Sequence, residues 1–79
     1  DAARVDCLTE EYAIEFDFGQ KWAESIGQAL YYGIKTGKRP GVVLILEKDT
    51  DARYLDRLNA VADKHGIKVW TMKPEEIKE

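Results

Sequence analysis

The chain has 79 residues, of which 44% are hydrophobic and 34% charged, with a formal net charge of -3 at pH 7. This composition predicts a single globular domain over residues 1–79 and argues against a disordered tail or a generally basic nucleic-acid coat. A single cysteine excludes an internal disulfide. Because the chain also has only one histidine, a His/Cys zinc site is excluded too. No apolar run is long enough to span a membrane, and the compartment stays open. The chain begins at Asp1 without methionine, so we expect a processed product or a fragment.

The first two predicted strands, Arg4–Thr9 and Tyr12–Phe18, form a hairpin, because apolar and polar residues alternate in both. Glu10-Glu11 is the predicted two-residue turn. The cross-strand neighbours are then Thr9 and Tyr12, Leu8 and Ala13, Cys7 and Ile14, Asp6 and Glu15, Val5 and Phe16, Arg4 and Asp17. Asn-Gly is the favoured turn of this length, so a register shifted by one residue is the alternative.

Four charged side chains share one face of this hairpin, since strand side chains alternate between faces: Arg4, Asp6, Glu15 and Asp17. Like charges directly opposite each other destabilise a ladder by about 0.2 to 1 kcal/mol. A pair of opposed carboxylates is therefore most often there to hold a cation. The alternative is a solvated face with an Arg4–Asp17 ion pair and two hydrated surface acids.

The remaining elements are a helix, a strand, a helix and a strand. They are predicted at Gln20–Thr36, Val42–Leu46, about Asp49–His65 and Ile67–Met72, with glycine stops at Gly37 and Gly66 and a short final helix from Pro74 to Ile77. The sequence therefore predicts an α/β fold with a mixed, mostly parallel four-stranded sheet in the order strand, strand, helix, strand, helix, strand.

The strand Val42–Leu46 is apolar on both faces, which is typical of a central parallel strand. Right-handed crossovers place both helices on one face of the sheet. The other face would be open. We therefore expect a homodimer, or a missing N-terminal segment, to cover it.

The first predicted helix carries a polar stripe of Lys21, Gln28 and Tyr32, with Glu24 as a possible addition. The alternative for Gln28 and Tyr32 is a helix–sheet contact, and the alternative for Glu24 is a position on the solvated surface. The loop after this helix holds Lys35, Lys38 and Arg39, either as solvated loop residues or as a phosphate-binding patch.

Residues 4–46 resemble the core of the PD-(D/E)XK, or restriction-endonuclease-like, nuclease superfamily. Asp6 matches the first acid of the family, Glu15 the acid of its Glu/Asp-x-Lys motif, and Gln28 to Tyr32 its Gln-x-x-x-Tyr motif. Asp17 stands where the family has lysine, and the first helix of the family fold is absent. Some members carry the lysine on the following helix, which makes Lys21 the candidate replacement.

The resemblance implies hydrolysis of DNA or RNA phosphodiesters, assisted by Mg²⁺ or Mn²⁺. Hard cations take oxygen ligands, so the implied metal ligands are Asp6, Glu15 and Asp17. The implied catalytic set is Asp6, Glu15, Asp17, Lys21, Gln28 and Tyr32. The alternative is a catalytically inactive interaction module that kept the scaffold and lost the lysine.

Overall fold

The elements follow one another as strand, strand, helix, strand, helix, strand in a computed structural model that describes residues 5–76. They are β1 (Cys7–Leu8), β2 (Tyr12–Phe18), the 3-10 turn η1 (Gly19–Lys21), α1 (Trp22–Thr36), β3 (Arg39–Ile45), η2 (Asp49–Asp51), α2 (Ala52–His65), β4 (Lys68–Met72) and η3 (Pro74–Glu76). The predicted α/β class and element order are confirmed. Arg4 and Ile77, at the ends of the predicted elements, lie outside the described residues.

The four strands form one sheet in the order β1-β2-β3-β4. β1 runs antiparallel to β2, while the β2–β3 and β3–β4 pairings are parallel. β3 is therefore the central parallel strand that its apolar run predicts. The sheet is therefore mixed, whereas the sequence predicts a sheet that is mixed but mostly parallel.

The hairpin has the predicted register. Cys7 pairs with Ile14 and Leu8 with Ala13, and the backbone N–H of Thr9 donates to the carbonyl of Tyr12 at 2.9 Å. The first strand is shorter than predicted. Beyond Cys7 the ladder gives way to side-chain contacts, because the carboxylate of Asp6, rather than a carbonyl, accepts the next N–H of β2.

Glycine ends both helices as predicted, with Gly37 and Gly66 in the left-handed region at φ 70° and 69°. The starts differ from the prediction, because a 3-10 turn precedes each helix. At α2 the buried carboxylate of Asp51 accepts the backbone N–H groups of Glu47 and Lys48 at 2.8 and 3.3 Å. Within residues 5–76, no helix is long and apolar enough to cross a membrane.

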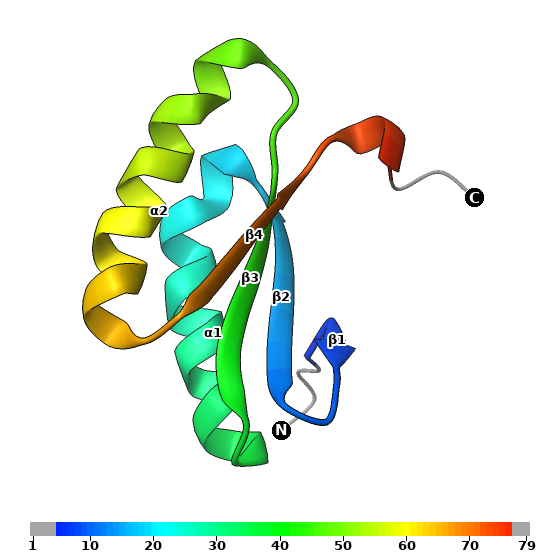
Figure 1. Ribbon diagram of the computed structural model, residues 1–79, viewed down its shortest axis with the longest axis vertical. Helices are drawn as coiled ribbons and strands as arrows, with labels where there is room; N and C mark the ends of the chain where they lie inside the picture. Colours follow the sequence, from blue (N-terminus) through cyan, green and yellow to red (C-terminus); the bar gives the residue numbers. More distant parts are fainter. Residues whose placement is uncertain (1–4, 77–79) are drawn as a thin grey trace.

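Both helices pack on one face of the sheet, as predicted from the handedness of the crossovers (Figure 1). Val42 and Leu44 of β3 are fully buried against Ala29 of α1 and Leu58 of α2. The next residues along β3 face the other way. The core of this small domain therefore lies between the sheet and a single layer of helices.

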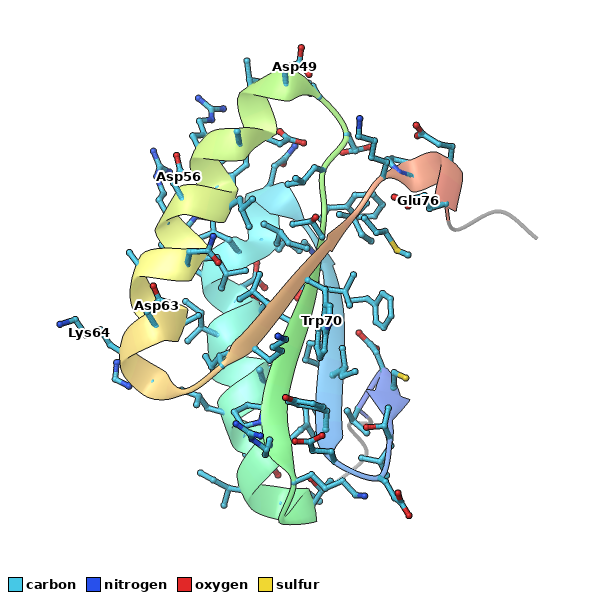
Figure 2. All side chains as sticks on the ribbon, in the orientation of Figure 1. Asp49, Asp56, Asp63, Lys64, Trp70 and Glu76 are labelled. Carbon is cyan, nitrogen blue, oxygen red and sulfur yellow. The ribbon has the colours of Figure 1, made fainter. Side chains whose placement is uncertain are left out.

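The opposite face of the sheet has no helix over it in the described part of the chain. Trp70 lies on this face, away from the helices (Figure 2), and its ring crosses Gly41, where an added Cβ would be 2.8 Å from the indole. Phe16 and Phe18 remain 37% and 45% exposed beside it. Trp70 thus substitutes for only part of a covering layer.

Self-association of two copies of the chain through this face stays a prediction. We expect the sedimentation mass of the wild type to rise over a hundredfold concentration range, because exposed aromatic surface drives association. Phe16→Ser should lower that rise. Ile34→Ser, at a helical position that is 84% exposed, is the control. A constant monomer mass for the wild type would show that the face is not an interface.

Candidate functional site

Asp6 and Glu15 meet where the β1–β2 ladder ends. The backbone N–H of Asp6 donates to Glu15 Oε2 at 3.4 Å, and the N–H of Phe16 donates to Asp6 Oδ2 at 2.9 Å. Each carboxylate thus holds a backbone donor of the opposite strand. The predicted proximity of the two acids is present, and it is built by these reciprocal bonds rather than by continued backbone pairing.

Glu15 is a buried acid in an acidic environment. Its residue is only 3% exposed, because it shares with Ala13 the face of β2 that α1 covers. Burial, and then the charges of Asp6 and Asp17, raise the pKa of Glu15 to about 7, although the hydrogen bond from the Asp6 backbone lowers it. A hydrated surface acid, the alternative for this position, does not describe Glu15. Asp6 itself is exposed.

Asp17 is half-buried and carries the one buried side-chain oxygen without a hydrogen-bond donor among residues 5–76, its Oδ2. Burial and the charge of Asp6 raise the pKa of Asp17, Lys21 lowers it, and Glu24 raises it. An unsatisfied buried acceptor is costly. Asp17 is therefore the acid in this cluster with the most to gain from a cation. The predicted ion pair of Asp17 with Arg4 lies outside the described residues.

Lys21 is the last residue of η1, just before α1 begins. It lies near the acidic cluster, the name used here for Asp6, Glu15 and Asp17. It is exposed, and its charge acts on Asp17. Within the described chain no carboxylate lies within ion-pair distance of its ammonium. Lys21 therefore acts on Asp17 through its charge alone, and its part in the site stays a prediction.

The two residues of the predicted helical motif differ in burial. Tyr32 is 7% exposed, and burial followed by the charge of Glu15 raises the pKa of its phenol. Tyr31 is 46% exposed and meets the Tyr32 ring edge-on at 5.2 Å. Gln28 is exposed, one turn before Tyr32. Tyr32 is thus the tyrosine of the motif that is buried and feels the charge of Glu15, while its role in a site stays a prediction.

A metal ion would find oxygen donors here, but not a finished cage. In the part of the chain that the structure describes, no three His, Cys, Asp or Glu side chains converge closely enough to hold an ion. Asp6 and Glu15 each accept a backbone N–H with one carboxylate oxygen. Asp17 Oδ2 has no donor. The donor chemistry fits Mg²⁺ or Mn²⁺, and such an ion would compete with two backbone N–H groups for the other two acids.

The basic residues after α1 have structural partners. Lys38 Nζ donates to the carbonyls of Thr9 and Glu10 at 2.6 and 2.9 Å, and Arg39 pairs with Glu11 at 2.8 Å. Both therefore tie β3 to the hairpin turn. These contacts explain the cluster without a phosphate, and Lys35 lies 5.8 Å from the Tyr31 ring centroid.

One cationic cluster was not predicted from the sequence. The guanidinium carbons of Arg53 and Arg57 lie 4.7 and 5.7 Å from the ring centroid of Tyr54, in the first turns of α2. Arg53 also donates to the Tyr54 hydroxyl at 2.9 Å. The spacing Arg-Tyr-x-x-Arg on a helix is the signal that would have found it, because Arg57 follows Tyr54 by three residues and Arg53 by four, and residues at these spacings are neighbours on a helix surface.

Comparisons with protein-family models, with curated proteins and with solved structures gave no significant match to this chain.

Proposed function

We propose that this chain is a metal-dependent nuclease with a restriction-endonuclease-like core that hydrolyses nucleic-acid phosphodiesters. The proposed metal ligands are Asp6, Glu15 and Asp17. Lys21, Gln28 and Tyr32 complete the proposed catalytic set. The proposal depends on the acidic cluster at the edge of the sheet and on the order of the elements around it.

The observation that carries the proposal is the buried Glu15 between two other carboxylates. A pKa raised to about 7 means that the protein keeps this acid at a buried place where its ionisation is costly. Strongly perturbed acids cluster at functional sites. The unpartnered Asp17 Oδ2 adds a second buried acceptor next to it.

Each residue has a distinct role in this proposal. Mg²⁺ or Mn²⁺, when bound, would polarise the phosphate and lower the pKa of a bound water. Glu15 and Asp17 would supply oxygens from a rigid strand, which fixes the position of the cation. Lys21, exposed and close to Asp17, would offset charge on the phosphate. Buried Tyr32 would keep Glu15 in place from the helix side.

A titration with Mn²⁺ tests the metal site before any cleavage assay. We expect the melting temperature to rise at millimolar Mn²⁺, because a ligand that binds only the folded state stabilises it. Paramagnetic broadening of NMR signals should be strongest at Asp6, Glu15 and Asp17. Asp17→Asn should abolish both effects.

Asp63→Asn is the matched control, since Asp63 is an exposed acid at the far end of α2 (Figure 2). It should leave the Mn²⁺ response unchanged. No response of the wild type to millimolar Mn²⁺ would contradict the metal site. Binding of Mn²⁺ without cleavage of any single- or double-stranded DNA or RNA would favour the inactive interaction module.

A further inference from the structure

The Arg53–Tyr54–Arg57 cluster stands beside the turn that leads from the acidic strand into α1. An added Cβ at Gly19, the first residue of that turn, would be 3.1 Å from the Tyr54 ring. Lys21, at the end of the same turn, acts on Asp17. Figure 1 shows the N-terminal ends of α1 and α2 at the same end of the molecule. The cluster and the acidic site are therefore connected through η1.

The two guanidinium groups are available for a ligand. Arg53 and Arg57 are exposed, and among the described residues neither lies within ion-pair distance of a carboxylate. Their contacts are with the Tyr54 ring, which is half-buried because its inner edge packs against Gly19 and the core. The ring therefore has a fixed position, and two cations are held beside it.

This combination has the chemistry of a single-stranded nucleic-acid contact. Guanidinium groups bind phosphates through a planar fork of donors, and a fixed aromatic ring offers a stacking surface for a base. An acidic peptide would need the two cations but not the ring. The ring beside the two cations is thus the observation that favours a nucleic acid over a protein partner.

We propose that Arg53, Tyr54 and Arg57 bind a single-stranded nucleic acid that continues from the acidic site over η1. This inference rests on the proposed nuclease function for its direction, but the contact itself needs neither metal nor cleavage. The two arginines hold backbone phosphates. Tyr54 supports one base and keeps both guanidinium groups in place.

Fluorescence anisotropy with a labelled single-stranded oligonucleotide in EDTA measures this contact without cleavage. The double variant Arg53→Gln/Arg57→Gln should bind about tenfold more weakly or worse, and the slope of log K against log salt should fall by about 1.4, since each phosphate contact to a single strand contributes about 0.7. Tyr54→Leu should weaken binding about fivefold or more by removing the stacking surface. Thermal melts confirm that each variant is folded.

Lys64→Gln/Lys68→Gln is the matched control, because it removes the same charge at the opposite end of α2 and the start of β4, and it should bind like the wild type. An equal loss in both double variants would overturn the inference in favour of a general charge effect. So would absent wild-type binding, or an unchanged affinity of the Arg53→Gln/Arg57→Gln variant. If that variant loses binding in EDTA while the wild type cleaves nothing with Mn²⁺, the contact stands and the nuclease proposal fails. If the Arg53→Gln/Arg57→Gln variant cleaves and binds like the wild type, the contact fails and the nuclease proposal stands.

Discussion

Replacing Lys21 with alanine is expected to lower the rate of metal-dependent phosphodiester cleavage by a factor of about 100 to 1,000, the usual cost of removing one group that stabilises transition-state charge. β2 carries no lysine or arginine, so in the proposed site Lys21 is the cation that offsets charge on the phosphate. Single-turnover cleavage with saturating Mn²⁺ measures the chemical step. KM should change less than the rate, because the effect is on the transition state.

The folded state should tolerate this change. Lys21 is exposed and makes no ion pair within the described chain, so the melting temperature of Lys21→Ala should match that of the wild type. Lys64→Ala, at the far end of α2 (Figure 2), is the control for loss of one positive charge. An unchanged cleavage rate in Lys21→Ala would remove this lysine from the site, and a lower melting temperature would assign it a structural role instead.

The register of the hairpin could be predicted from the sequence, because a two-residue turn at Glu10-Glu11 sets the pairing of Cys7 with Ile14 and of Leu8 with Ala13. The glycine stops of both helices could also be predicted, since only a residue without a Cβ takes the left-handed region without cost. Both rules are local, since each depends on a few neighbouring residues. Their success explains why the element order came out as expected.

The ends of the elements could not be predicted in the same way. Asp6 bonds to the N–H of Phe16, so β1 is two residues long rather than six. Asp51 bonds to two N–H groups before α2. In both places a carboxylate, rather than a backbone carbonyl, accepts a backbone N–H. Whether a carboxylate binds the backbone, water or a cation depends on its tertiary surroundings, which the periodicity of the sequence does not show.

The composition of the site was predictable, but its electrostatics were not. The alternation of residues places Asp6 and Glu15 together, yet only the position of α1 decides that Glu15 is buried while Asp6 is exposed. The roles of Lys38 and Arg39 depend equally on the turn that they reach, 28 or 29 residues away in sequence. The cluster around Tyr54 was not predicted, although its spacing is present in the sequence.

The free energy of unfolding is expected to fall as the pH rises from about 4.5 to about 7. Between these values the folded state keeps a proton on Glu15 that the unfolded chain has lost, since its ordinary pKa is 4.5 and burial raises it to about 7. The folded state thus binds more protons, and stability declines with pH in this window. At about 1.4 kcal/mol for each pKa unit, the decline is of order 3 kcal/mol, and the raised pKa of Asp17 acts in the same direction.

Urea unfolding at pH 5 and pH 8 measures this decline, and Glu15→Gln should remove most of it. The amide oxygen of glutamine can still accept the Asp6 N–H, so the variant loses the charge and keeps the bond. It should therefore be more stable than the wild type at pH 8 and similar at pH 5. Glu10→Gln, an exposed turn residue, should follow the wild type at both. Equal pH dependence in the wild type and Glu15→Gln would show that Glu15 is ionised across the range, and the argument from a strained buried acid to a cation site would lose its basis.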